Sequence, residues 1–122
     1  MTEYLITIPG DEAVWDARTD EDNQTVGLAH RDFVATLTER GHRVKAGGEL
    51  TPLAQATVVR RKDRGTLVTD GPYAEASEQV GGFYLVASDD FDDLLAIVGQ
   101  LVATEPVVEV RPLVQRTTGV PS

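Results

Sequence analysis

Two histidines, His30 and His42, are the natural candidates for proton-transfer chemistry in this chain of 122 residues. Histidine commonly serves as a general base because its ordinary pKa lies near neutral pH. His42 follows a predicted helix end in a polar stretch, so we expect it at the surface. His30 lies one turn from Val26 and one turn from Val34, on or beside an apolar helix face. It can therefore be either a structural residue or a catalytic base.

Asp70 is the carboxylate that could pair with His30. It ends a predicted strand and precedes Gly71-Pro72. An Asp in this position commonly bonds the backbone N–H groups of its own turn. If the turn faces the helix, Asp70 could instead accept a hydrogen bond from His30, which would fix the tautomer of the ring and make an acid–base dyad.

Other charged residues offer weaker candidates. Glu75 and Glu78 are three apart, so a helical turn would put both on one side, as a solvated turn, an acid–base pair or a cation site. Arg111 lies in a predicted strand and could form an ion pair or bind a substrate carboxylate. With no cysteine and two separated histidines, the spacings of transition-metal sites are missing, and we expect no metal.

Composition narrows the function classes. A formal net charge of −9 would repel a phosphate backbone, which argues against nucleic-acid binding. The cluster 60–64 is the local basic exception, and we expect it to be the solvated end of a hairpin. The N-terminus lacks the pattern of a signal peptide or a membrane span, and the lack of cysteine fits a reducing cytoplasm. We therefore expect a cytoplasmic protein without a membrane partner.

Hydrophobic periodicity predicts the elements that position these residues. One helix starts at Thr19 or Asp20 and stops at Gly41, and a second is capped by Ser88 or Asp89 and extends to Val102. Gly81-Gly82 either lets two backbones approach or turns the chain with positive φ. The expected strands are 2–8, 42–45, 56–61, 66–69, 83–87 and 107–111.

This order predicts an α+β, ferredoxin-like fold, in which two helices cover one face of a mainly antiparallel sheet of five or six strands. Residues 1–114 form one domain, and residues 115–122 form a loose tail. The second face of the sheet would be covered most simply by another subunit.

The run VTDGPYAEASEQVGGFYLV, residues 68–86, closely resembles the signature of the YCII-related family, in its DGPF-domain branch. GDEAVW, AHRDF, GGELTP and EVRPL are similar to family elements in the same order, and the resemblance covers residues 2–114. Two positions depart from the family pattern. Tyr73 replaces the usual Phe, and Ser77 stands where the family often has Lys.

The resemblance implies a dimeric α/β barrel in which two subunits pack sheet against sheet. It also implies a pocket in which a His and an Asp meet, which supports His30 and Asp70 as catalytic residues. Tyr73, Glu75, Glu78 and Arg111 are the candidate ligand-binding residues. We expect a homodimer that binds a small molecule or, through the family's association with sigma factors, a regulatory protein of that type. The alternative is a cofactor-independent enzyme that uses the His30–Asp70 dyad.

Overall fold

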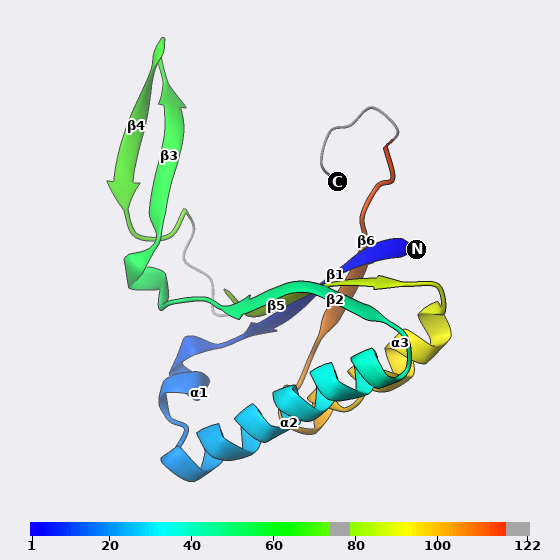
Figure 1. The fold of residues 1–122 in the computed structure, drawn as a ribbon. Helices are drawn as coiled ribbons and strands as arrows, with labels where there is room; N and C mark the ends of the chain where they lie inside the picture. Colours follow the sequence, from blue (N-terminus) through cyan, green and yellow to red (C-terminus); the bar gives the residue numbers. More distant parts are fainter. Residues whose placement is uncertain (74–78, 117–122) are drawn as a thin grey trace.

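A four-stranded antiparallel sheet, ordered β2-β5-β1-β6, forms the centre of the molecule (Figure 1). The structure is a computed structural model that describes residues 1–73 and 79–116. The helices lie along one face of the sheet, which is the predicted α+β, ferredoxin-like arrangement. The strands are β1 (Thr2–Gly10), β2 (Arg43–Glu49), β5 (Gln79–Ser88) and β6 (Glu109–Pro112), and the helices are α1 (Glu12–Asp16), α2 (Asp20–Glu39) and α3 (Phe91–Val98).

A separate two-stranded hairpin projects from this body. It pairs β3 (Thr57–Lys62) with β4 (Gly65–Asp70), as the sequence predicted. The hairpin is not part of the main sheet, so the expectation of one sheet with five or six strands was wrong. A short 3-10 turn (Leu53–Gln55) leads into the hairpin, and the hairpin stands on the side of the sheet opposite the helices (Figure 1).

Helix α2 has strong signals at both ends. The Thr19 side chain accepts a hydrogen bond from the Asp22 backbone, and the Asp22 carboxylate accepts one from Thr19, which makes a capping box. Hydrogen bonding to Thr19 lowers the pKa of Asp22 below its ordinary value, and the bond with the Thr19 backbone has the largest effect. Gly41 has φ of +88° just after the helix, which is favourable for glycine. The predicted start and stop of this helix are confirmed.

The hydrophobic core lies between the helices and the covered face of the sheet. Ile6 and Val86 come from neighbouring strands, and Phe33 and Leu37 come from α2. The remaining core side chains belong to α3 and the residues after it. They are Leu94, Ile97, Val98 and Leu101. Burial of these side chains fixes the helices on the sheet and so fixes the position of His30 in the middle of α2.

The second helix is shorter than predicted. Asp90, rather than Ser88 or Asp89, caps α3 by accepting from the Asp93 backbone, and the helix ends at Val98. A 3-10 turn (Leu101–Ala103) follows. The apolar periodicity continues through this turn, so periodicity alone could not locate the end of the helix. None of the helices in the described ranges is long and apolar enough to cross a membrane.

Two glycine pairs, Gly47-Gly48 and Gly81-Gly82, lie inside strands. Strand β2 continues through Gly47 and Gly48, beyond the predicted end of this strand at residue 45. A Cβ at Gly47 would lie 2.7 Å from the Tyr84 ring, so this strand needs glycine to pass the ring. Gly81 and Gly82 lie in β5 without positive φ, which leaves close approach as their role.

His42 is buried, contrary to the expected surface position. Its ring nitrogens lie 2.8 Å from the Ser88 hydroxyl and 2.7 Å from an Asp93 carboxylate oxygen. Asp93 also contacts the Arg40 guanidinium. The polar sequence around His42 concealed this position, because its partners come from the end of β5 and from α3. This arrangement joins the C-terminal end of α2 to the start of α3.

We predict that Ser88→Ala lowers the free energy of unfolding by about 2 kcal/mol, because it removes a buried hydrogen-bond partner of His42. The Ser88 hydroxyl also bonds the Asp90 backbone before α3, and these bonds would be lost. Urea denaturation measures the change. Thr69→Ala, which removes an exposed hydroxyl in β4, is the control and should change stability by less than about 0.5 kcal/mol. Equal effects of the two substitutions would contradict a structural role for this cluster.

Candidate functional site

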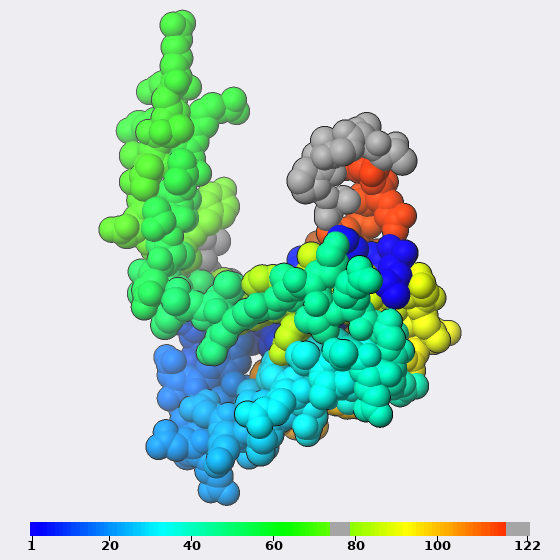
Figure 2. Space-filling view, viewed as in Figure 1, coloured from blue at the N-terminus to red at the C-terminus, as the bar shows by residue number. Residues whose placement is uncertain are grey.

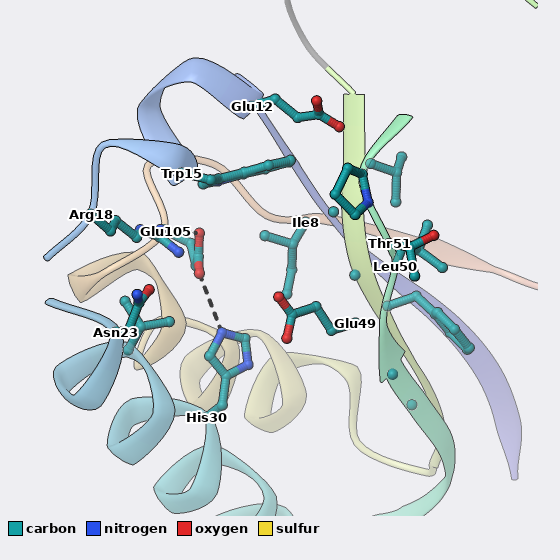
Figure 3. Close-up of a pocket in the computed structure, with 18 of the residues that line it drawn as sticks. Ile8, Glu12, Trp15, Arg18, Asn23, His30, Glu49, Leu50, Thr51 and Glu105 are labelled. Atoms are coloured by element: carbon teal, nitrogen blue, oxygen red, sulfur yellow. Dashed lines mark hydrogen bonds and ion pairs between the residues drawn. The ribbon is translucent and has the colours of Figure 1, made fainter. Parts of the chain in front are cut away.

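A cavity of about 980 Å³ lies between α1, the first half of α2 and the adjoining ends of β2 and β5 (Figure 3). This volume is in the range of ordinary small-molecule sites. Apolar and aromatic side chains make much of its wall, and charged side chains lie among them. The lining residues include Ile8, Glu12, Trp15, Asp16, Arg18, Val26, His30, Glu49, Tyr84 and Glu105.

Glu105 is the centre of the polar network at this cavity. Its side chain is only 4% exposed, and its two oxygens have different partners. One oxygen lies 3.2 Å from an Arg18 guanidinium nitrogen, and the other lies 3.3 Å from Nε2 of His30 (Figure 3). A buried carboxylate is costly unless it is paired and hydrogen-bonded, and these two contacts meet that requirement.

Three separate parts of the chain supply this network. Arg18 lies between α1 and α2, immediately before the Thr19 cap, so the start of α2 fixes its backbone. His30 lies in the middle of α2, and Glu105 follows the 3-10 turn after α3. The buried bond therefore exists only when α2 and the segment after α3 have packed on the same face of the sheet.

Tyr84 completes the arrangement from strand β5. Its hydroxyl oxygen lies 2.6 Å from Nδ1 of His30, and the two rings stack with centroids 5.8 Å apart. Phe33 packs against the Tyr84 ring and holds it from the core side. Both ring nitrogens of His30 therefore have partners, and its side chain is 22% exposed at the cavity.

The pKa shifts indicate where the protons are. Burial alone would raise the pKa of Glu105, but the His30 hydrogen bond and the Arg18 charge together lower it below its ordinary value. Burial, and secondarily the charge of Glu105, raises the pKa of Tyr84. At neutral pH, Glu105 is thus an anion that can only accept, and Tyr84 keeps its hydroxyl proton.

These protonation states define the tautomer of neutral His30. Nε2 donates to Glu105, and Nδ1 accepts from the Tyr84 hydroxyl. His30 can accept a proton at Nδ1, while Glu105 stabilises the resulting imidazolium. It can also bind a polar group of a ligand without any reaction. Glu105 thus fixes the tautomer of the His30 ring, which is a role that the sequence had suggested for Asp70.

Trp15 forms one wall of the cavity by packing on two glycines. A Cβ at Gly10 would lie 2.4 Å from the Trp15 ring, and one at Gly81 would lie 2.6 Å from it. The pairing of β1 with β5 passes from Ile8–Gly82 to Pro9–Val80, so Gly81 is the extra residue of a β-bulge. Of the pair Gly81-Gly82, Gly81 thus allows the close approach of an aromatic ring.

The predicted site residues fall in different places. Asp70 ends β4 in the projecting hairpin, and the described hydrogen bonds of His30 go to Tyr84 and Glu105 rather than to Asp70. Tyr73 is 77% exposed, with Arg60 over its ring at 5.4 Å. Arg111 lies in β6 and forms no ion pair with any residue in the described ranges.

None of Asp70, Tyr73 and Arg111 lines the cavity, and Glu75 and Glu78 lie outside the described residues. The described ranges hold no group of three or more His, Cys, Asp or Glu side chains that could bind a metal. The catalytic role of His30 and Asp70, and the ligand-binding role of the others, stay predictions.

Sequence reasoning missed Arg18 and Glu105. Arg18 lies among acidic residues between the first expected strand and the first expected helix, and Glu105 comes after the apolar run of the second helix. The one available signal was Glu105-Pro106 between two apolar segments, where a charged residue has to be solvated or paired. Its partner could not be chosen, because 75 residues separate Glu105 from His30.

An antiparallel sheet with helices on one face, and a cavity beside a His–Glu–Arg network, define a ferredoxin-like α+β protein with a pocket beside this network. The model of the YCII-related domain matches residues 2–116, so the chain belongs to the YCII-related family. An uncharacterized protein of Rhizobium meliloti (strain 1021) is 33% identical to it over 115 residues, which is 90% of each chain. Membership in the DGPF-domain branch stays a prediction.

We predict that Glu105→Gln lowers the free energy of unfolding by about 2 kcal/mol at neutral pH, because Arg18 and His30 lose an anionic partner. The variant should also lose part of the pH dependence of stability. Because the folded-state pKa of Glu105 is lowered, its contribution is present above the ordinary carboxyl pKa. It disappears as the pH falls through the lowered value.

Urea denaturation from neutral to acid pH measures both effects. The wild type should lose stability on acidification more steeply than Glu105→Gln over this range. Glu39→Gln, at an exposed position in the last turn of α2, is the control and should keep the wild-type slope. Parallel curves for wild type and Glu105→Gln would show that Glu105 is not held as an anion in the folded protein.

Proposed function

We propose that this protein is a small-molecule-binding protein whose ligand occupies the cavity beside His30. The observation that carries this proposal is the buried Arg18–Glu105–His30 network at the wall of a cavity lined in large part by apolar groups. A few fixed polar groups in an otherwise apolar pocket are typical of ligand sites. Structural packing alone would not require a partly exposed imidazole at the surface of the cavity.

The charges around the cavity favour a cationic or neutral ligand over an anionic one. The carboxylates of Glu12, Asp16 and Glu49 line it together with Glu105. The guanidinium of Arg18 is paired with Glu105, and Glu12 accepts from the Leu53 backbone at 2.6 Å. Glu49 lies on the opposite side of the cavity from Arg18, at the end of β2 (Figure 3). The local potential should therefore attract a positive charge.

The apolar part of the wall indicates the body of the ligand. Trp15 and Tyr84 provide aromatic surface, and Ile8 and Val26 provide aliphatic surface. A small molecule with an apolar or aromatic body and a basic or hydrogen-bonding end fits this combination.

We predict that aromatic amines bind more tightly than aromatic carboxylates of the same size. Trp15 is the single tryptophan of the chain and lines the cavity, so its fluorescence reports occupancy directly. A library of matched amine and acid pairs, such as phenethylamine and phenylpropionate, can be titrated against this signal and ranked by thermal shift. Binding by the amines should raise the unfolding temperature and change the fluorescence.

His30→Gln should weaken binding of the best amine about tenfold or more, because it changes the hydrogen bonds at the cavity. Arg31→Gln is the matched control, since Arg31 is exposed on the same helix and does not line the cavity. Equal affinity in both variants would remove His30 from the site. A preference for acids would contradict the proposed ligand class.

The second candidate function is a cofactor-independent enzyme that uses His30 for proton transfer. The 2.6 Å contact between the Tyr84 hydroxyl and Nδ1 of His30 favours it, because a short bond suits proton transfer. Asp70 stays the alternative partner of His30 in this proposal. Nuclear magnetic resonance spectra of a bound compound, followed over hours with wild type and Tyr84→Phe, would distinguish turnover from simple binding.

We also propose that the protein is a homodimer in which the uncovered sheet faces pack together. Leu5 of β1 lies directly opposite Leu85 of β5, on the face away from the helices. Phe83, two residues before Leu85, lies opposite Thr7 on the same face. Leu5 is 37% exposed in the single chain. Apolar side chains on an open sheet face are most simply buried by another sheet.

We predict that the wild-type protein has twice the 13.2 kDa mass of the chain in solution and that Leu5→Lys is monomeric. A lysine on each facing sheet would place like charges in an apolar contact. Light scattering after size exclusion measures the mass at micromolar concentration. Leu28→Lys, at an exposed leucine of α2, is the control and should stay dimeric. A wild-type particle of monomer mass would contradict the dimer.

A regulatory role with a sigma-factor-type partner, and a cytoplasmic location, stay predictions that rest on the family resemblance and on composition. In the regulatory form of the proposal, the same cavity would bind the ligand and the protein surface would bind the partner. The ligand experiment tests the part that both forms share.

A further inference from the structure

The hairpin formed by β3 and β4 lies almost outside the body of its own chain. All six residues of β4 are exposed, and in β3 only Val58 is partly covered. The two strands are closed at the base of the hairpin, where the Gly71 backbone donates to the Ala56 carbonyl at 2.7 Å. Figure 2 shows it as a thin arm with open space on both sides.

An arm of this kind needs a surface to pack on. A two-stranded hairpin has marginal stability in water unless another element covers one of its faces. Val59 and Val68 are 63% and 60% exposed. They lie directly opposite each other across the two strands, so they form one apolar patch on one face. Paired exposed valines in a projecting hairpin indicate a contact surface rather than a solvated loop.

The charge of the arm differs from that of the whole chain. The end of the arm carries four cationic side chains and a single carboxylate, that of Asp63. The cations are Arg60, Arg61, Lys62 and Arg64. The whole chain has a formal net charge of −9. A basic arm on an acidic protein is complementary to the surface of another copy of the same chain.

The position of the arm also favours a second copy. The arm rises on the side of the sheet that the helices leave uncovered (Figure 1). A copy that covers the open face around Leu5 and Leu85 would lie beside the arm. The open sheet face and the valine patch would then be covered in a single assembly.

We propose that the β3–β4 hairpin is a dimerisation arm, whose Val59–Val68 face and basic end pack on a second copy of this chain. This inference rests on the proposed homodimer and goes beyond it, because packing of the sheets alone does not require the arm. It also accounts for the basic cluster 60–64, which the cavity does not use. In a symmetric dimer, each arm would contact the other subunit, so the two arms would act together.

The affinity test replaces both valines with threonine, as Val59→Thr/Val68→Thr, which keeps branched side chains that favour strands. Sedimentation at a series of concentrations should give a dimer dissociation constant raised about tenfold or more. Val14→Thr, at an equally exposed valine of α1, is the control and should leave the constant unchanged. High salt should weaken the wild-type dimer, because it screens the basic end.

A cross-linking test locates the arm directly. The chain has no cysteine, so Thr66→Cys provides a single attachment point in the hairpin. The thiol can carry a maleimide-linked benzophenone, and the labelled protein is mixed with unlabelled chain that bears an affinity tag. Irradiation should give a covalent product between labelled and tagged chains. The same label on Leu28→Cys, at an exposed position of α2, should give little of this product.

The outcomes separate the two proposals. A wild-type monomer would overturn both the dimer and the arm, while the ligand experiment would be unaffected. A stable dimer whose affinity is unchanged in Val59→Thr/Val68→Thr, with no cross-link from Thr66→Cys, would overturn the arm alone. Weaker dimerisation together with an arm-specific cross-link to the tagged chain would support the inference.

Discussion

The buried carboxylate of Glu105 is the interaction on which the site depends. It is almost fully removed from water and remains an anion only because Arg18 and His30 both reach it. Losing either partner would leave a buried charge insufficiently compensated. The network therefore fixes the orientation of His30, and His30 in turn orients the Tyr84 hydroxyl at the cavity. Any proton transfer or ligand binding by His30 therefore depends on how the charge of Glu105 is compensated.

The same requirement links the site to the fold. Glu105 can bond Arg18 and His30 only after α2 and the segment behind α3 have packed on the sheet through the hydrophobic core. Just beyond the C-terminal end of α2, His42 makes a comparable link to Ser88 and Asp93. Each histidine thus joins α2 to a later part of the chain. The first faces the cavity, and the second is enclosed.

Local sequence signals predicted much of the architecture. The cap at Thr19, the stop at Gly41 and the hairpin between β3 and β4 all depend on residues that are neighbours in the sequence. The predictions that depended on contacts between distant residues were less accurate. His42 was expected at the surface because it follows a helix end in a polar stretch, and its partners, 46 and 51 residues away, could not be inferred from that stretch. The end of α3 was misplaced because the apolar pattern continues into the turn that follows.

The sequence by itself determined the α+β class, the family resemblance and the choice of His30 as the residue to examine. These depend on residue types, on periodicity and on caps, which act over a few residues of backbone. Only the tertiary structure decided which partners His30 has. Hydrogen bonds require side chains to meet within about 3 Å. Tyr84 and Glu105 reach that distance only after helix and sheet have packed.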